Sequence, residues 1–273
     1  MRKILQCVIT SNDTNKDATN IIGAIKRAGF DGVFLQWYNK ELPLSQQKQF
    51  DLCQKLGLDV EFVHLGYKGI NNIWLDGEDG DALVNYYKND LDACNKNGVK
   101  LVVMHITSKM IAPAPSAIGV KRLKEIADYA DKLEIRIAFE NTKLKGYLEY
   151  VFDNIKNQNI GICLDVGHSH CHFEDDFDFE KFKGKIWAVH LHDNHGKMDD
   201  DRASDEHLLP FDGDIDWKYY TRKLIESGYT GSVTLESHNK YYPNLSLDEF
   251  YKLSYEKAKK LKEMFEDFTN EKQ

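Results

Sequence analysis

The chain contains 273 residues, of which 36 are Lys or Arg and 44 are Asp or Glu, so its formal net charge is −8. This acidic balance argues against a protein that coats nucleic acid or binds membranes through a polybasic surface, because both bind phosphates through cations. It does not exclude a local basic groove. With 42% hydrophobic and 29% charged residues, and no apolar run of about 18 residues, the composition predicts a soluble globular protein without a membrane span.

The first predicted element is a strand over residues 3–10, where a short apolar run follows Arg2 and Lys3. The run begins like a signal peptide, but Gln6 interrupts it and no small-residue cleavage site follows. The five cysteines are odd in number and widely spaced, without a C-x-x-C pair. Because disulfide frameworks of secreted proteins use even sets of cysteines, this usage predicts a cytoplasmic location.

Further short apolar runs follow along the chain, and most are separated by longer amphipathic stretches. The complete set of predicted strands is 3–10, 31–37, 58–65, 99–106, 134–141, 159–165, 186–192 and 231–237. Helical patterns occupy residues 17–28, 44–56, 81–96, 116–133, 144–156, 216–227 and 247–268. Gly57, Gly98 and Gly228 stand where helix C-caps are expected, directly before the next strand.

Repeated units of a strand and a helix predict a parallel sheet. Eight continuously apolar strands, without a G-x-G-x-x-G or Walker loop after the first, favour a (β/α)8 TIM barrel over an open doubly wound sheet. No linker divides the chain, so residues 1–273 are predicted to form a single domain. The long loops 66–80 and 193–214 follow the third and seventh strands, on the face where such barrels place their active site.

Six consecutive predicted strands each end on a histidine or a carboxylate: His64, His105, Glu140, Asp165, His190 and Glu236. Side chains of these types make up only about one fifth of the chain, so the coincidence points to a shared task. Six such groups in one barrel mouth would be costly without a counter-charge, and a divalent cation removes that cost. Mixed oxygen and imidazole ligands suit Zn²⁺, Mn²⁺, Co²⁺ or Fe²⁺ better than Ca²⁺.

Three more residues extend this set of candidate ligands. His168 lies three residues after Asp165, close enough in a tight loop to face the same cavity. Asp205 and His207 are separated by one residue, so an extended segment would turn both side chains to one side. The nine candidates are sufficient for one to three metal ions.

Several of these segments carry a resemblance to a known family. Residues 138–142 (AFENT), 163–168 (CLDVGH), 189–193 (VHLHD) and 234–237 (TLES) resemble the metal-binding strands of the xylose-isomerase-like barrel superfamily. That superfamily contains sugar and sugar-phosphate isomerases and epimerases, and also the endonuclease IV enzymes of DNA repair. Residues 205–217 (DEHLLPFDGDIDW) resemble a run common in the isomerase and epimerase branch.

The resemblance implies a role for each matching residue. Glu140, Asp165, His190 and Glu236 match the four-ligand metal site of sugar isomerases and ketose epimerases, in which the two glutamates also move protons. The other candidates match further ligands of the trinuclear zinc site of endonuclease IV: His64, His105, His168, Asp205 and His207. The first strand lacks the histidine motif expected of endonuclease IV, and residues 168–172 differ from that enzyme's run, which favours the isomerase branch.

The favoured hypothesis is a metal-dependent isomerase or epimerase of a sugar, sugar phosphate or cyclitol. This chemistry moves a proton next to a carbonyl and therefore needs an acid and a base, for which Glu140 and Glu236 are the candidates. The alternatives are a zinc phosphodiesterase that cuts DNA at abasic sites and a sugar-binding barrel without catalysis. The expected partner is a small carbohydrate rather than nucleic acid or membrane. The sequence is also compatible with a homo-oligomer.

Four residues are predicted to contact the substrate. His168 and His207 are candidates for substrate binding as well as for metal binding. Trp37 is expected to form an apolar wall for a sugar ring, and Arg202, in the long seventh loop, is expected to hold a substrate phosphate.

Overall fold

The computed structural model describes residues 2–8, 18–37, 45–173 and 177–270, without the side chains of residues 201 and 202. In these ranges, eight parallel strands occur where the apolar runs predict them: β1 (Ile4–Val8), β2 (Gly32–Gln36), β3 (Asp59–His64), β4 (Leu101–Met104), β5 (Arg136–Glu140), β6 (Ile160–Asp165), β7 (Ile186–His190) and β8 (Val233–Leu235). Residues 9 and 10 of the first predicted strand lie outside the described part.

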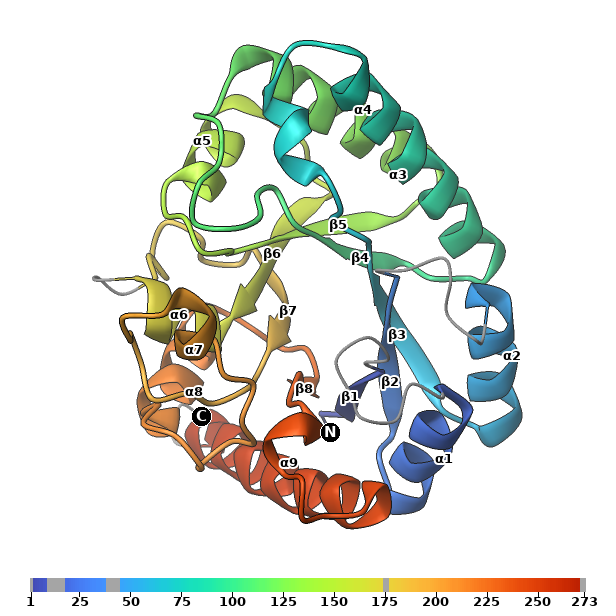
Figure 1. The fold of residues 1–273 in the computed structure, drawn as a ribbon, viewed down its shortest axis with the longest axis vertical. Coiled ribbons are helices and arrows are strands. Elements are labelled where there is room, and N and C mark those ends of the chain that lie inside the picture. Colours follow the sequence, from blue (N-terminus) through green and yellow to red (C-terminus); the bar gives the residue numbers. More distant parts are fainter. Residues whose placement is uncertain (1, 9–17, 38–44, 174–176, 271–273) are drawn as a thin grey trace.

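The strands close into a barrel. Their order in the sheet is β7-β6-β5-β4-β3-β2-β1-β8, and a parallel bridge between Leu191 and Leu235 joins the two ends. The backbone of Leu191 donates to the Thr234 carbonyl oxygen at 2.9 Å, and Glu236 N donates to the Leu191 carbonyl oxygen at 3.2 Å. Figure 1 shows the helices around the outside of these strands. The prediction of a (β/α)8 TIM barrel is therefore confirmed.

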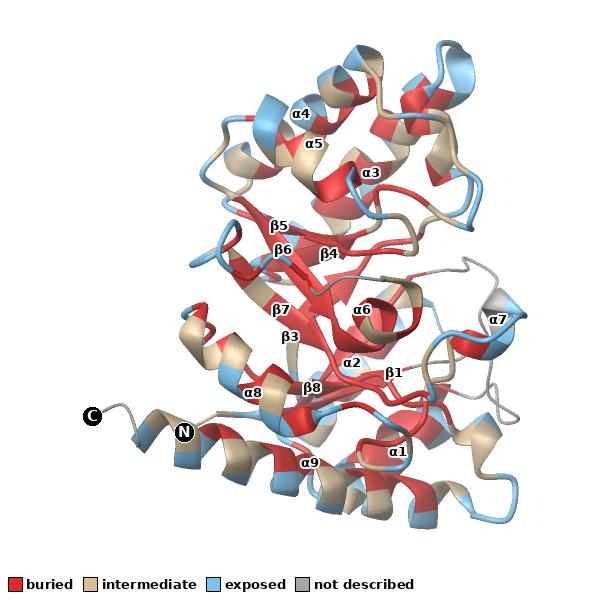
Figure 2. Ribbon diagram, turned by 90° about the vertical axis from the view of Figure 1, so that its left-hand side faces the viewer, coloured by how far each residue is buried: buried red, intermediate tan, exposed pale blue. Residues whose placement is uncertain are grey.

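The helices that connect the strands lie close to their predicted positions: α1 (Ala18–Ala28), α2 (Gln46–Leu56), α3 (Glu78–Lys96), α4 (Ala117–Lys132), α5 (Tyr147–Asn154), α8 (Trp217–Glu226) and α9 (Leu247–Asn270). The last helix, α9, packs against α1 and α8. In Figure 2 the strands are mostly buried, although β3 begins with less buried residues, while the helices alternate between buried and exposed faces. None of the helices in the described residues combines the length and apolarity that crossing a membrane requires.

Local signals in the sequence explain where several helices begin and end. The Asp216 side chain accepts a hydrogen bond from the backbone N–H of Tyr219 at 3.0 Å and caps α8. Gly57, Gly98 and Gly228 follow α2, α3 and α8 with φ values of 62°, 74° and 86°. Glycine adopts this left-handed conformation without steric cost. Gly57 is the predicted C-cap of α2, while Gly98 and Gly228 end their helices one residue beyond the C-caps Asn97 and Ser227.

The alternation of side chains divides the core into two parts. One set of residues points into the barrel and forms a layer, called the inner layer below: Leu5, Cys7, Phe34, Phe62, Leu101, Val103, Ala138, Cys163 and Ala188. Their neighbours along each strand, such as Val33, Val63 and Leu164, belong to the larger core beneath the helices. Because successive side chains of a strand point to opposite faces, the next inward position after the inner layer lies at the barrel mouth.

Four short elements were not predicted from the sequence: α6 (Val166–His172), α7 (Asp201–Ser204) and the 3₁₀ turns η1 (Ile70–Trp74) and η2 (Asn239–Tyr241). Two of them, η1 and α7, lie within the long loops 66–80 and 193–214. Helix α6 begins directly after β6, and its sequence, VGHSHCH, lacks the apolar periodicity that identifies longer helices.

Candidate metal centre and active site

The polar groups at the barrel mouth follow directly from the inner layer. In six strands an inner-layer residue is followed two positions later by a polar residue: Gln36 after Phe34, His64 after Phe62, His105 after Val103, Glu140 after Ala138, Asp165 after Cys163, and His190 after Ala188. Glu236 directly follows β8. The strand period of two therefore turns seven polar side chains from seven strands toward one region.

Glu140, the last residue of β5, lies at the centre of a cluster of imidazoles. Its Oε2 atom is 2.9 Å from His64 Nε2, 3.3 Å from His105 Nε2 and 3.5 Å from His190 Nδ1. Its Oε1 atom is 3.4 Å from His168 Nδ1. The carboxylate is only 1% exposed, so these four imidazoles are its main polar surroundings.

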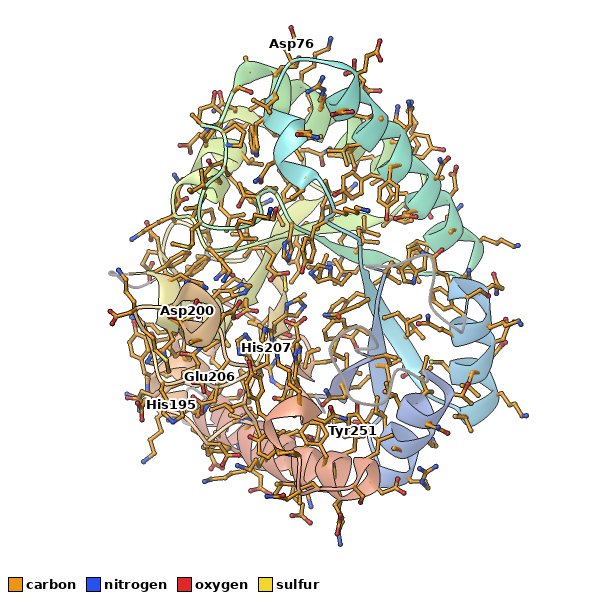
Figure 3. The ribbon with its side chains drawn as sticks, in the orientation of Figure 1. Asp76, His195, Asp200, Glu206, His207 and Tyr251 are labelled. Atoms are coloured by element: carbon orange, nitrogen blue, oxygen red, sulfur yellow. The ribbon has the colours of Figure 1, made fainter. Side chains whose placement is uncertain are left out.

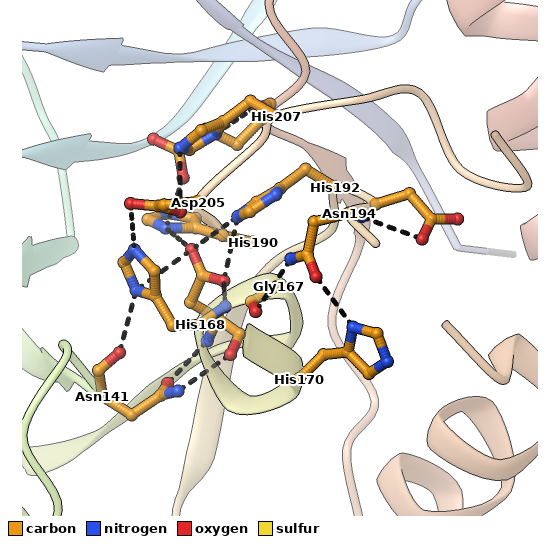
Figure 4. A network of polar contacts seen from close by, with 12 residues as sticks. Asn141, Gly167, His168, His170, His190, His192, Asn194, Asp205 and His207 are labelled. Carbon is orange, nitrogen blue, oxygen red and sulfur yellow. Dashed lines mark hydrogen bonds and ion pairs between the residues drawn. The ribbon is translucent and has the colours of Figure 1, made fainter. Parts of the chain in front are cut away.

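Asp165 ends β6 and starts helix α6. One carboxylate oxygen accepts a hydrogen bond from the backbone N–H of His168 at 2.7 Å, and the other lies 3.5 Å from the same residue's Nδ1. His192 Nε2 approaches the carboxylate to 3.1 Å. Gly167 makes this approach feasible, because a Cβ atom there would lie 2.0 Å from the His192 ring. Figure 4 shows that α6 brings His168 back toward the strand ends.

The loop after β7 is held in place by Asp193, which is fully buried. Its carboxylate accepts hydrogen bonds from Trp217 Nε1 at 2.8 Å and from the backbone N–H groups of Phe211 at 2.8 Å and Ile215 at 3.1 Å. Its backbone also pairs with Leu208 in an antiparallel bridge. These contacts of Asp193 fix the path of residues 205–217 at the barrel mouth.

The same loop delivers Asp205 and His207 to the site. Asp205 lies 3.5 Å from His168 Nε2 and 3.6 Å from His207 Nε2. His207 Nδ1 is 2.7 Å from the backbone oxygen of Glu236. In Figure 3, His207 lies toward the middle of the barrel, while Glu206 and His195 lie farther out. Glu206, which lies between Asp205 and His207 in the chain, therefore points away from the site that these two candidate ligands share.

The ionisable groups of the cluster set one another's charge. Burial opposes ionisation of Glu140, but the imidazoles of His105 and His190 outweigh it and hold the Glu140 pKa well below its usual range. Burial likewise opposes ionisation of Asp205, and His168 overcomes it, so that the Asp205 pKa is also well below its usual range. Burial lowers the His105 pKa, the neighbouring imidazoles of His64 and His168 lower it further, and together they outweigh the opposing effect of Glu140. The site therefore favours ionised carboxylates beside at least one neutral imidazole.

This donor set fits a divalent cation. Groups of three ligand atoms lie within 4.8 Å of one another in the sets His64, Glu140 and His190; Glu140, Asp165 and His168; Asp165, His192 and Glu236; His192, Asp205 and His207; and Cys171, His172 and Asp205. Within the described residues, neither ring nitrogen of His190 forms a hydrogen bond, although its Nδ1 lies 3.0 Å from Glu236 Oε2. A buried imidazole among carboxylates without a hydrogen bond is an arrangement that a metal ion would complete.

All nine predicted ligands are thus brought together at the barrel mouth. Eight of them occur in the groups above, and the ninth, His105, lies 3.3 Å from Glu140. A cavity of about 810 Å³ opens from this cluster and is lined by Glu140, His168, Asp205, His207 and Glu236 among others. Tyr67 also lines it, with its ring stacked on His105 at a centroid distance of 4.1 Å.

Two of the predicted substrate contacts are not placed in this cavity. Trp37 is 1% exposed and packs edge-on against Phe50 at a centroid distance of 6.0 Å. It is absent from the described lining of the cavity, because the residue before it, Gln36, is the inward-facing one. Trp37 is therefore part of the core beneath α2 rather than a wall for a sugar. Arg202 lies in α7, and its side chain is outside the described part.

Sequence reasoning missed two polar residues of the site. Gln36 was overlooked because only ionisable residues were considered at strand ends, although the two-residue offset from Phe34 applies to it as well. His192, the last residue of the predicted strand 186–192, was not among the nine predicted ligands. The structure places it, fully buried, in two of the candidate ligand groups.

The comparisons with known proteins agree with this architecture. A family model described as a xylose isomerase-like TIM barrel matches residues 22–264. An uncharacterized protein of Sinorhizobium fredii, y4fM, is 30% identical over 115 residues, which are 42% of this chain and 35% of that protein. The chain spans only 35% and 42% of the length of the first two curated relatives that it matches.

Two further relatives have named activities. The inosose isomerase of Bacillus subtilis is 24% identical over 196 residues, which are 67% of each chain. A probable endonuclease 4 of Mesoplasma florum is 24% identical over 230 residues, which are 71% of this chain and 76% of that one.

Solved structures resemble the whole chain. A D-tagatose 3-epimerase-like protein superposes with a TM-score of 0.74 at 21% identity and covers 99% of both chains. An L-ribulose 3-epimerase superposes with a TM-score of 0.75 at 17% identity, over 99% of this chain and 97% of that one. At these identities the likeness concerns the fold alone.

Proposed function

Because the chain belongs to the family of xylose isomerase-like TIM barrels, we propose that it is a metal-dependent isomerase or epimerase of a sugar, sugar phosphate or cyclitol. The observation that carries this proposal is the pair of buried glutamates, Glu140 and Glu236, which lie 3.5 and 3.0 Å from the same His190 Nδ1 atom and line one cavity. The similarity to an inosose isomerase and to sugar epimerases supports the same class of reaction.

Glu140, Asp165, His190 and Glu236 are the residues that would hold the metal. The further candidates His64, His105, His168, Asp205 and His207 would hold additional ions or contact the substrate. When bound, a divalent cation such as Zn²⁺, Mn²⁺ or Co²⁺ supplies a Lewis acid that stabilises negative charge on substrate oxygens.

The two glutamates would carry the proton transfer. In the proposed reaction one carboxylate removes the proton from the carbon next to the substrate carbonyl. The other glutamate, which has first taken up a proton from solvent, returns it to the adjacent atom or the opposite face, so the two glutamates exchange protonation states in each turnover. Burial raises the cost of ionising Glu236, but the His190 imidazole overcomes it and lowers the Glu236 pKa. Both glutamates are therefore suited to act as a base in the resting site.

The walls of the cavity would orient the substrate. His168 and His207 line it together with the two glutamates and would offer ring nitrogens to sugar hydroxyl groups. Tyr67, whose ring is stacked on His105, also lines the cavity and would add an aromatic group of the kind that packs against sugar rings.

The proposal is tested by incubating the metal-loaded protein with a panel of ketoses, their phosphates and inosose in deuterated water. The expected result is incorporation of deuterium at one substrate carbon, and at least a hundredfold loss of that exchange in Glu140→Gln and Glu236→Gln, since general acid–base catalysis contributes roughly 10²–10⁴-fold. Glu125→Gln, which alters an exposed ion pair of α4, is the matched control. Binding of a sugar without exchange would instead identify a barrel that binds sugar without catalysis.

A second candidate function is a zinc phosphodiesterase that acts on abasic DNA. It is favoured by the convergence of all nine candidate ligands and by the similarity to a probable endonuclease 4. Three zinc ions per chain together with cleavage of an abasic duplex at low salt would establish this function. A single ion and no cleavage would exclude it.

The remaining predictions also stay proposals. We propose that the protein acts in the cytoplasm, and its five buried free cysteines agree with a reducing compartment. We likewise propose a single domain over residues 1–273, a small carbohydrate as partner and a homo-oligomer.

A further inference from the structure

A buried amide lies beside one of the two proposed catalytic glutamates. Gln36 is the last residue of β2 and is 4% exposed. It follows Phe34 by two positions, and Phe34 stacks on Phe62 at a centroid distance of 4.7 Å and on His190 at 5.0 Å. The strand and this aromatic floor therefore hold the base of the Gln36 side chain in one position.

The two oxygens of Glu236 have different partners. Gln36 Nε2 donates a hydrogen bond to Glu236 Oε1, while Glu236 Oε2 lies 3.0 Å from His190 Nδ1. A carboxylate can rotate about its last side-chain bond, and two separate partners remove that freedom. Gln36 thus fixes the plane of the Glu236 carboxylate, with one oxygen toward the amide and the other toward the imidazole.

The described hydrogen bond of the Gln36 side chain goes to the Glu236 carboxylate and not to the backbone of a neighbouring strand. Within the described residues, its Nε2 donates to Glu236, and its Oε1 has no hydrogen-bond partner. A buried amide that served only to stabilise the strands would be expected to use both of its polar atoms. A neutral donor is also chemically suitable, because a lysine or arginine at this position would add a positive charge that competes with a cation for the carboxylate.

We propose that Gln36 is a positioning residue that orients the Glu236 carboxylate for metal binding and proton transfer. This inference rests on the function proposed above. Residues that hydrogen-bond to a metal ligand typically change metal affinity by about 10–100-fold when they are removed. Gln36 is therefore expected to matter to the metal even though it is not itself a ligand.

The test is a titration of the metal-free protein with Co²⁺, followed by its visible absorption spectrum, which reports the coordination geometry. Gln36→Met keeps the length of the side chain and removes the amide, and it is expected to weaken Co²⁺ binding about 10–100-fold and to change the spectrum. The matched control is Gln6→Met, which removes another fully buried amide whose described hydrogen bond goes to the Cys7 backbone oxygen. The control is expected to keep the affinity and the spectrum of the wild type.

Failure of this inference differs from failure of the proposed function. A wild-type protein without a Co²⁺ spectrum would contradict the metal centre as a whole. A normal wild-type spectrum, with Gln36→Met unchanged in affinity and spectrum, would overturn only the role of Gln36. If the variant does not fold, a crystal structure of the wild type with Co²⁺ decides: a Gln36 amide bonded to Glu236 supports the role, and an amide turned away from it refutes the role.

Discussion

At the scale of single residues, the polar groups of the barrel mouth rest on apolar side chains that keep water away from them. Cys163 belongs to this inner layer and lies two positions before Asp165. Burial raises its pKa to about 12, and it does the same for Cys53 and Cys171. These thiols are consequently neutral packing groups rather than nucleophiles.

The cysteines give a prediction at this scale. A thiol with a pKa of about 12 is ionised in only about one molecule in ten thousand at pH 8, so a raised pKa lowers the reactive thiolate fraction. All five free cysteines are buried, and we expect less than one thiol per chain to react with Ellman's reagent within minutes in the native protein. All five should react in guanidinium chloride. Rapid labelling of the folded protein would show that at least one of these buried thiols is open to solvent.

At the scale of elements, the loop after β7 depends on one carboxylate. Asp193→Asn replaces an acceptor with a donor opposite the N–H groups of Trp217, Phe211 and Ile215. Buried donors left without an acceptor cost about 1–3 kcal/mol each, so we expect the free energy of unfolding to fall by roughly 3 kcal/mol. Metal affinity should fall as well, since the loop carries Asp205 and His207.

Urea unfolding measures this change through the midpoint concentration at constant slope. Asp128→Asn, which removes an exposed ion pair with Lys124, is the control and should cost less than about 1 kcal/mol. An Asp193→Asn variant as stable as this control would show that the loop is held by other contacts.

The elements also show how far the sequence could be read. The strands and six strand-end ligands were predictable because a period of two along an apolar strand fixes both the strand and the side on which its last residue lies. Helix α6 was not, since seven polar and small residues carry no apolar period, and its start depends on the Asp165 side chain. Trp37 was predicted to form a wall of the substrate cavity. The same alternation of side chains turns its neighbour Gln36 inward and Trp37 toward α2.

At the scale of the whole molecule, the barrel joins side chains that are far apart in the sequence. His64 and Glu236 are brought to one rim only when β8 pairs with β1 and the bridge from Leu191 to Leu235 closes the sheet. Because the unfolded chain does not hold this set of ligands, metal binding should stabilise the folded barrel.

This coupling predicts a thermal shift. At a Mn²⁺ or Co²⁺ concentration of about 100 times the dissociation constant, binding adds about 2.7 kcal/mol. For a chain of this size that corresponds to a rise in Tm of roughly 5–10 °C. Differential scanning calorimetry of the metal-free and metal-loaded protein measures it, and the Glu140→Gln/Glu236→Gln double variant should show a much smaller rise. Equal rises in both proteins would locate the ion elsewhere.

The most direct measurement is an anomalous difference map from crystals of the protein grown with Co²⁺. We expect at least one strong peak at the barrel mouth, at about 2.0–2.2 Å from ligand atoms of Glu140, Asp165, His190 and Glu236. A map with no peak among these four residues, or with peaks only on the outer surface, would contradict a metal centre built from the strand ends.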